Sequence, residues 1–334
     1  MVCDSLTEME QDALTLVRRG RCCSRAELSR KMGISRPTAS LLVERLLELR
    51  CLRESGRGKA PRGKSPTLLT PVPEYQYTLG LDLGYTERLA GVLVDGEYRI
   101  VRRAEAKFDN SSLESIRSRS ASLLEKLAGK SEITGLGIAL PGILDPRTNR
   151  VLRSIVPLFA RYDMQALFTE WTGLPAVVEN RSRSAAFSEA FGGAADSQNN
   201  FVLVSLGKSI GAAFWLNGSV FTGSFGAAGE IRSLRLGDGR TLEEALSLAC
   251  VQNYSEEELV SICAEGLHQL TELMDLDRLV LAGRFTDFGP IFRKKLTAKL
   301  NVYRKCRIVF SGYGRFSAAR GAAMSMCEKA LAAR

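Results

Sequence analysis

Apolar residues recur every three or four positions in three stretches of the first 50 residues, which predicts three amphipathic helices. The first two stretches end at Gly20 and Gly33, and glycine is a common stop residue for helices. In the third stretch, Ser35 is placed to cap a helix and Pro37 is tolerated in its first turn. The expected buried positions are Leu6, Met9, Ala13, Leu16 and Val17 in the first helix, and Ala39, Leu42, Val43, Leu46 and Leu49 in the third.

The third helix and the segment after it have the pattern of a winged helix-turn-helix. The first turn of this helix presents short polar or basic side chains, which a helix needs in order to approach base edges in a major groove. Residues 51–71 then have the pattern of a strand, a basic loop with Gly and Pro, and a second strand, so the loop can reach phosphates or a minor groove as a wing. The predicted DNA-contact residues are Ser35, Arg36, Pro37, Thr38, Ser40, Arg45, Arg57, Lys59, Arg62 and Lys64.

The positive charge of the chain is concentrated in this N-terminal segment. Residues 1–70 contain 14 Lys and Arg against 8 Asp and Glu, a net charge of +6 out of +9 for the whole chain. A basic module attached to a nearly balanced body indicates a polyanion-binding domain, so we expect residues 1–73 to bind double-stranded DNA. The alternative for the same pattern is a small helical protein-interaction domain with a solvated charged loop.

Two later segments share one succession of strands and turns. Alternating apolar residues predict a strand–turn–strand–turn–strand unit in residues 75–108 and another in residues 201–222. The turn glycines are Gly84 and Gly96 in the first unit, and Gly207 and Gly218 in the second. They are offset by 123 residues at the first turn and by 122 at the second. Such a repeat predicts a duplicated, two-lobed fold with a cleft between the lobes.

The composition excludes several classes of protein. Of the 334 residues 45% are apolar and 25% charged, and no apolar run approaches the roughly 18 residues of a membrane helix. The acidic N-terminus is unlike a secretory or mitochondrial leader, so we expect a cytoplasmic protein with reduced cysteines and no membrane partner. His268 is the only histidine and no two cysteines form a CxxC pair, so we expect no zinc or other metal.

Further motifs extend the duplicated pattern. Each first turn aims backbone N–H groups at the expected cleft, as loops that grip phosphate do. In order along the chain stand LGLDLGYT, GLGIALPGILDPRTNRVLRS, VVENRSRSAAFSEA, GAAGE, LVLAGRFTDFGPIF and GRFSAARGAA. With these motifs the chain resembles, over essentially its whole length, the ROK family (repressor, open reading frame, kinase) in its transcriptional-regulator form.

The resemblance implies a fold and a division into domains. The fold class is α/β, with a two-lobed actin/sugar-kinase-like (ribonuclease H-like) body preceded by an all-α winged helix-turn-helix domain. The expected domains are residues 1–73 for DNA binding, residues 77–181 with 317–334 for the small lobe, and residues 182–316 for the large lobe. The resemblance also places a catalytic segment around Asn180, a sugar-binding segment at GAAGE, and an adenosine site near the last two motifs.

Three departures from the family's kinases concern catalysis. Where the resemblance implies an Asn-Asp pair whose Asp is the general base, this chain has Asn180-Arg181, and arginine cannot accept a proton. The second phosphate loop, Gly-Thr-Gly-Ile-Gly in the family, is Gly207-Lys208-Ser209-Ile210-Gly211 here, without the middle glycine. The large side chains of Arg284 and Phe285 stand where the sugar of adenosine would lie. Because a kinase needs base, phosphate grip and nucleotide together, we expect no enzyme activity and no cofactor.

The sugar site that the resemblance implies is half kept. Glu230 and Glu243 stand where the family has two glutamates, but Arg232 replaces a histidine, and the short RSLRLGDGR replaces the family's zinc loop. In one interpretation Arg181 and Arg232 pair with the two glutamates and close an empty pocket. In the other, the two guanidinium groups bind an anionic ligand such as a sugar phosphate or a sugar acid. The candidate ligand-binding residues are Gly142, Asn180, Arg181, Glu230, Arg232 and Glu243.

Several neighbouring residues have two interpretations. Pro141, Gly142 and Asp145 form either a wall of the same pocket or a tight turn after a buried strand. Lys208 either fills vacated phosphate space or is solvated. The resemblance implies that Asp82 supports a metal-phosphate region, but with its partners missing we expect it to serve loop structure.

These expectations describe a DNA-binding transcriptional regulator, a repressor, whose inactive kinase-like body senses a sugar or sugar derivative, mediates dimerisation, or does both. We expect a homodimer or higher homo-oligomer whose winged helices contact half-sites one or more helical turns apart. Closure of the lobes on a ligand would change the spacing or freedom of these domains. The alternatives are an active ATP-dependent sugar kinase with a regulatory DNA-binding arm, and a module that recruits another protein.

Overall fold

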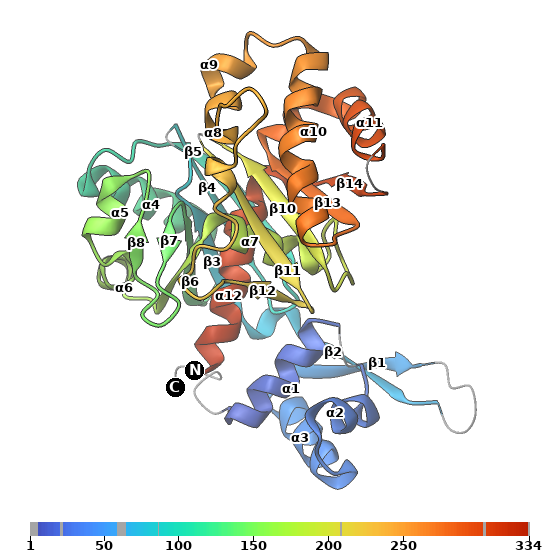
Figure 1. The fold of residues 1–334 in the computed structure, drawn as a ribbon. Coiled ribbons are helices and arrows are strands. Elements are labelled where there is room, and N and C mark those ends of the chain that lie inside the picture. The colour runs from blue at the N-terminus through green and yellow to red at the C-terminus, as the bar shows by residue number, and fades with distance from the viewer. Residues whose placement is uncertain are drawn as a thin grey trace.

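The computed structural model describes residues 6–20, 23–58, 65–85, 87–207, 209–302 and 305–332. Figure 1 shows a body of two lobes with a small N-terminal domain below it, and the C-terminal helix runs between the lobes toward that domain. Within the described ranges, no helix combines the length and apolar character that crossing a membrane requires.

Three helices and a β-hairpin build the N-terminal domain. They are α1 (Glu8–Arg18), α2 (Arg25–Met32), α3 (Arg36–Glu48), and the antiparallel strands β1 (Leu52–Arg57) and β2 (Thr67–Pro71). Gly33 adopts a left-handed conformation after α2, and the Ser35 hydroxyl accepts the backbone N–H of Thr38 at the start of α3. Both helix boundaries therefore lie where the sequence predicts them.

The buried face of α1 differs from the predicted one. Met9 is 44% exposed, whereas Leu14, which the periodicity did not select, is fully buried. The reason is that α1 packs on α3 and β2 and also contacts the C-terminal helix of the body, so its buried face is turned. The face of α3 is as predicted, with four of its five positions buried and Leu49 partly buried.

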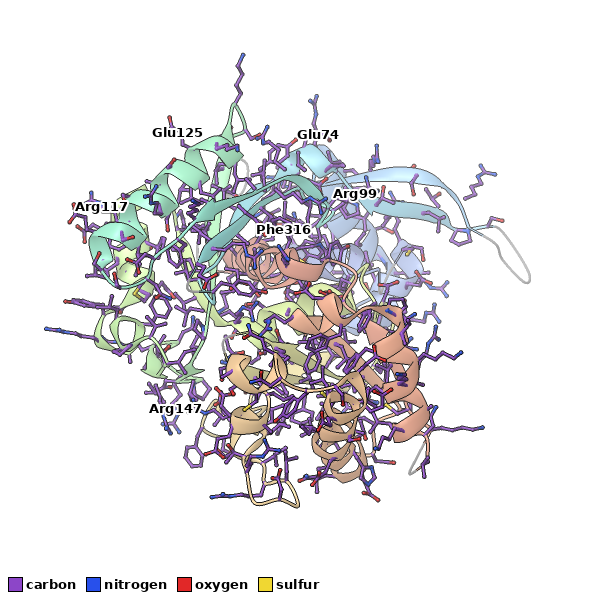
Figure 2. The ribbon with its side chains drawn as sticks, turned by 90° about the horizontal axis from the view of Figure 1, so that it is seen from above. Glu74, Arg99, Arg117, Glu125, Arg147 and Phe316 are labelled. Carbon is purple, nitrogen blue, oxygen red and sulfur yellow. The ribbon has the colours of Figure 1, made fainter. Side chains whose placement is uncertain are left out.

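The first lobe is built on a five-stranded sheet of order β5-β4-β3-β6-β9. Its strands are β3 (Tyr77–Asp82), β4 (Arg88–Val94), β5 (Ile100–Lys107), β6 (Ile133–Leu140) and β9 (Ala176–Asn180). Between β6 and β9 the chain forms the hairpin β7 (Ile143–Leu144) and β8 (Val151–Arg153), then α5 (Pro157–Arg161) and α6 (Met164–Thr172). Helix α4 (Leu113–Ala128) covers the outside of the sheet, with Arg117 and Glu125 pointing to solvent (Figure 2).

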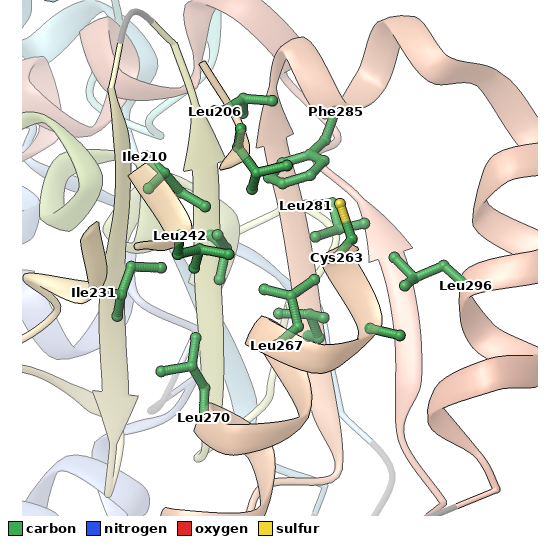
Figure 3. Close-up of a cluster of buried hydrophobic side chains, with 14 of the residues drawn as sticks. Leu206, Ile210, Ile231, Leu242, Cys263, Leu267, Leu270, Leu281, Phe285 and Leu296 are labelled. Carbon is green, nitrogen blue, oxygen red and sulfur yellow. The ribbon is translucent and has the colours of Figure 1, made fainter. Parts of the chain in front are cut away.

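The second lobe repeats this sheet. Its order is β12-β11-β10-β13-β14, with β10 (Phe201–Leu206), β11 (Ile210–Leu216), β12 (Ser219–Phe221), β13 (Arg278–Gly283) and β14 (Arg307–Phe310). The covering helices are α8 (Leu242–Ala245), α9 (Leu248–Val251), α10 (Glu256–Leu273) and α11 (Gly289–Leu300). Figure 3 shows the core of this lobe, where Leu267 of α10 lies against apolar side chains of the sheet.

The two sheets share one topology as well as one strand order. In each, three antiparallel strands come first and two parallel strands are added beside the first of them. In the second sheet, Asn217 and Gly218 both adopt positive φ at the hairpin turn, which suits the Asn-Gly sequence. The duplication predicted from the turn spacing is therefore confirmed.

Two helices, α7 (Arg181–Ala190) and α12 (Ser317–Ala332), pack against each other between the sheets. The contact is close because small residues line it. A Cβ on Gly321 of α12 would overlap with the backbone of Ser184 in α7, and on the sheet side a Cβ on Gly137 of β6 would overlap with the backbone of Ala322 in α12. The predicted lobe boundary falls at the first residue of α7, and the proposed division into lobes stays a prediction.

The N-terminal domain is attached to this helix pair by charged and aromatic contacts. The Arg19 guanidinium, just after α1, forms a salt bridge with Glu328 of α12, with Nε 2.7 Å from Oε1. It also lies over the rings of Phe187 and Phe191, at 5.4 and 5.5 Å from their centroids. The neighbouring Arg18 donates to Gln76 over 2.9 Å and is itself buried.

Candidate ligand cleft and DNA-binding surface

Most of the predicted DNA-contact residues in α3 and at its N-cap are exposed. Ser35, Arg36, Pro37 and Thr38 are exposed, Ser40 is half-buried, and Arg45 is exposed and 3.5 Å from Glu48. Arg57 is exposed at the end of β1, while Lys59, Arg62 and Lys64 lie outside the described residues. Sequence analysis missed Leu41, which is 67% exposed on the same helix, because periodicity selects buried residues and not exposed apolar ones.

One cleft between the lobes gathers most of the predicted ligand residues. It encloses about 70 Å³, several times the ~10–15 Å³ that one water molecule needs. Five of the six candidates line it, namely Gly142, Asn180, Arg181, Glu230 and Arg232. Pro141 also lines it, which favours the pocket-wall interpretation for that residue, whereas Asp145 uses its carboxylate to accept the N–H groups of Arg147 and Thr148 in a tight turn.

Arg181 has a different partner from either glutamate considered above. Its Nε donates to both carboxylate oxygens of Asp82, each 3.0 Å away, and its Nη1 donates to Ser205 Oγ over 3.2 Å. Burial lowers the pKa of Arg181, but Asp82 and Tyr85 together outweigh this effect through charge and hydrogen bonding, so the pKa is raised overall. The interpretation in which Arg181 pairs with Glu230 or Glu243 is therefore wrong.

The same guanidinium lies between the two loops that resemble phosphate loops. It is 4.2 Å from the ring centroid of Tyr85 in the first loop. A Cβ on Gly84 would overlap with the Arg181 side chain, and a Cβ on Gly207 in the second loop would be 3.4 Å from its Nη1. Asp82 also accepts the N–H of Gly84 over 2.8 Å, so it holds the first loop as well as the arginine. Lys208, at the tip of the second loop, lies outside the described residues.

The two glutamates have separate tasks. Glu230 is 3.5 Å from Arg232, as one of the interpretations expects, and both side chains are partly exposed. Glu243 does not line the cleft, because its Oε2 accepts the Ser209 hydroxyl at 2.8 Å and the Ile210 N–H at 2.9 Å. The place of Glu243 in the ligand site is thus corrected to that of a residue that holds the second loop from behind.

Asn180 is occupied by the backbone of its own lobe. Its Nδ2 donates to the carbonyl of Gly142 over 2.8 Å, and its Oδ1 accepts the Arg183 N–H and so caps α7. It lines the cleft, but these bonds use both ends of its amide. Asn180 therefore fixes the start of α7, and with it the position of Arg181.

Phe285 is not in the position expected near an adenosine site. It is fully buried in the core of the second lobe (Figure 3). Its ring is stacked on that of Phe292, with centroids 6.5 Å apart. The chain turns inward after β13 because Gly283 has a positive φ and a Cβ there would overlap with the carbonyl oxygen of Leu206. Of the two large side chains expected near the adenosine site, Phe285 is therefore buried in the core and Arg284 is half-buried.

Sequence reasoning missed several lining residues, above all Arg153, Ser154 and Ser205. Arg153 ends β8 and is exposed at the cleft. It lies in the quoted motif GLGIALPGILDPRTNRVLRS, but its direction depends on the β7–β8 hairpin, which no local pattern shows. In the part of the chain that the structure describes, no group of three or more His, Cys, Asp or Glu side chains is arranged to hold a metal ion.

Comparison with known proteins shows which family this chain resembles. Residues 78–239 match the family model described as ROK family. The chain is 23% identical to the xylose repressor of Bacillus spizizenii, over 86% of this chain and 77% of that protein. It is 25% identical to the xylose repressor of Bacillus subtilis over 62% of this chain, and 31% identical to the glucokinase of Halalkalibacterium halodurans over 47%. The last two matches span 55% and 49% of those relatives, about half of their length.

Solved structures share the fold. A ROK family transcriptional regulator, a homologue of the MLC protein of E. coli, superposes with a TM-score of 0.71 at 17% identity, over 96% of this chain and 95% of that one. A ROK family glucokinase from Streptomyces griseus, in complex with glucose and AMPPNP, gives 0.68 at 18%, over 75% and 98%. The first match covers too much of the chain to omit the N-terminal domain. The domain of three helices and a hairpin thus precedes a two-lobed body whose residues 78–239 are similar to the ROK family.

Proposed function

We propose that the chain is a transcriptional repressor that binds double-stranded DNA through α3 and the β1–β2 wing. The capped, exposed first turn of α3 suits a major groove, and the wing starts with the exposed Arg57. The excess of positive charge in residues 1–70 suits phosphate contacts. The relatives named xylose repressor support the same role.

The observation that carries the second half of the proposal is the position of Arg181. In this proposal the body does not phosphorylate sugar, because a permanently protonated group occupies the place of the proton acceptor. The same side chain fills the space between Gly84 and Gly207, where phosphate groups would have to approach the backbone. In this proposal one residue, Arg181, removes both the general base and the space in which the two loops would bind phosphate. The competing function is that of an active sugar kinase, because one of the relatives is named glucokinase.

We further propose that the cleft is a sensor for a sugar or sugar derivative and that the protein acts as a homo-oligomer, at least a dimer. The helix pair α7 and α12 connects the cleft with the N-terminal domain. Helix α7 starts at Arg181 in the cleft, and its Phe187 contacts Arg19, which is bound to Glu328 of α12. A ligand that moves the lobes would move this attachment and so change DNA affinity by its differential binding. The names of the relatives make xylose the first sugar to test.

Two measurements on the purified full-length protein test this function. Binding sequences are selected from a random duplex pool, and affinity for selected and random DNA is then measured by fluorescence anisotropy at several salt concentrations. A coupled assay follows ATP consumption with xylose, glucose and amino sugars. We expect selective, salt-dependent DNA binding and no sugar-dependent ATP consumption. Failure to bind duplex in dilute buffer would reject the repressor, and ATP-dependent sugar phosphorylation would establish the kinase.

A further inference from the structure

We propose that the ligand of the cleft is a monosaccharide that carries a phosphate or a carboxylate, and that this anionic group lies between Arg153 of one lobe and Arg232 of the other. The inference rests on the proposed sensory role of the cleft and names the chemical class of its ligand. Its basis is the charge of the lining, in which the described residues include three arginines and a single carboxylate, that of Glu230.

Arg153 is the strongest reason for an anionic ligand. It ends β8, faces the cleft and is exposed. Its backbone pairs with Ile143 in the β7–β8 hairpin, but its side chain makes no hydrogen bond or ion pair with any other residue that the structure describes. A guanidinium presents five N–H donors in a planar fork that fits two oxygens of a phosphate or carboxylate at once. Arg153 therefore has its full capacity available for a ligand.

Arg232 adds a second cation from the opposite lobe. It belongs to the short 3-10 helix Ile231–Ser233, which follows β12 of the second sheet. Its one ion pair among the described residues is with Glu230 at 3.5 Å, and the two side chains are 25% and 34% exposed. Exposed pairs of this length are weak, so the guanidinium can take a second acceptor while Glu230 remains free to accept a sugar hydroxyl.

Arg181 does not compete for the same role, because Asp82 neutralises it. The positive charge that remains on the walls is thus divided between Arg153 and Arg232, on opposite sides of the cleft. Like charges repel when the cleft holds no anion, and an anion between them attracts both. A neutral sugar would leave Arg153 without an anionic partner and Arg232 with the weak pair to Glu230 alone. The anionic group is therefore the part of the ligand that draws the lobes together.

Thermal unfolding and calorimetric titration of the full chain test this inference at low salt. The probes are xylose and glucose as neutral sugars, glucose 6-phosphate, glucuronate, and inorganic phosphate alone. We expect glucose 6-phosphate or glucuronate to raise Tm and to bind at least tenfold more tightly than glucose. R153A and R232A should each weaken this binding about tenfold or more, as expected for a lost hydrogen bond to a charged group.

R117A is the matched control, because Arg117 is an exposed arginine on the outer face of α4, outside the cleft (Figure 2). It removes the same charge and should leave sugar binding unchanged. Equal affinity for neutral and anionic sugars, equal losses in R153A and R117A, or no binding of any anionic probe would each overturn the inference. Inorganic phosphate binding as tightly as glucose 6-phosphate would overturn the part that concerns the sugar. DNA binding measured on the same samples separates these outcomes from a failure of the proposed function.

Discussion

At the residue scale, the chemistry of the cleft depends on the pair of Arg181 and Asp82. The Asp82 side chain is fully buried and that of Arg181 is 12% exposed, so both charges are largely removed from water. A buried ion pair of this kind adds little over an apolar pair, but loss of one partner leaves a buried charge without compensation. We therefore expect the pair to contribute little to the total stability, but we expect a large loss of stability when either residue is replaced alone.

Replacing Arg181 with Met should destabilise the protein by roughly 3 kcal/mol, because the Asp82 carboxylate would stay buried with the Gly84 N–H as its one hydrogen-bond donor among the described residues. Urea unfolding followed by circular dichroism measures the change. The double variant D82N/R181M removes both charges and should recover a substantial part of the loss. A single variant as stable as the natural protein, or a double variant less stable than the single one, would contradict the importance of the pair.

Replacing Arg36 with Ala should reduce the discrimination between selected and random DNA by about 1–3 kcal/mol, as for the loss of a contact to a base edge. The prediction rests on the exposure of Arg36 in the first turn of α3, where the helix is capped by Ser35. Competition binding with the two DNAs measures it. An equal loss of affinity for both would instead assign Arg36 to phosphate contact.

At the element scale, we expect the wing to contribute mainly to affinity for any duplex, and the recognition helix α3 to contribute mainly to sequence specificity. The variant R57A/K59A should weaken binding to all duplexes and reduce the slope of log affinity against log salt by about 2, roughly one for each cation that contacts a phosphate. Arg57 is exposed at the end of β1. Affinity measured from about 50 to 200 mM salt tests this prediction. An unchanged slope would remove the hairpin loop from the DNA interface.

The attachment of α1 to α12 is a second element-scale feature with a measurable consequence. The Glu328 carboxylate forms the salt bridge with Arg19 and also accepts a hydrogen bond from the Tyr98 hydroxyl over 2.8 Å. We expect R19A and E328Q each to speed protease cleavage in the segment after β2, because either one loosens the N-terminal domain. The double variant should add little to either single change, since both remove the same contact. Additive effects of the two changes would show that the two side chains act independently.

Some elements were predictable from the sequence and others were not. The helices of the N-terminal domain and the strands around the turn glycines follow local periodicity and turn chemistry, which act within a few residues. The buried face of α1 was not predicted well, because the burial of Leu14 and the exposure of Met9 depend on tertiary contacts of α1. One of these contacts is with α12, which lies more than 300 residues later in the sequence. The inward turn that buries Phe285 was likewise hidden, since it depends on the close approach of Gly283 to Leu206.

At the scale of the whole molecule, the inactivity that we propose should not be reversible by one substitution. R181D restores a carboxylate at the place of the general base, yet it puts a second carboxylate beside Asp82 and leaves the second loop without its middle glycine. We expect no sugar-dependent ATP consumption from R181D in the coupled assay, with the natural protein as reference. Clear activity in this variant would mean that the nucleotide grip is intact and that the base alone is missing.

The sequence by itself determined the succession of elements, the duplication, the basic N-terminal domain and the presence at position 181 of an arginine, which cannot accept a proton. These features depend on local periodicity, residue type and spacing, all of which can be read without a fold. Only the tertiary structure decided that Arg181 binds Asp82, that Glu243 stands behind the cleft, and that Arg153 faces it. Asp82 is about 100 positions from Arg181 in the sequence, and the direction of Arg153 depends on the β7–β8 hairpin. Contacts of this kind form only in the folded lobes, where desolvation and packing determine which charged groups meet.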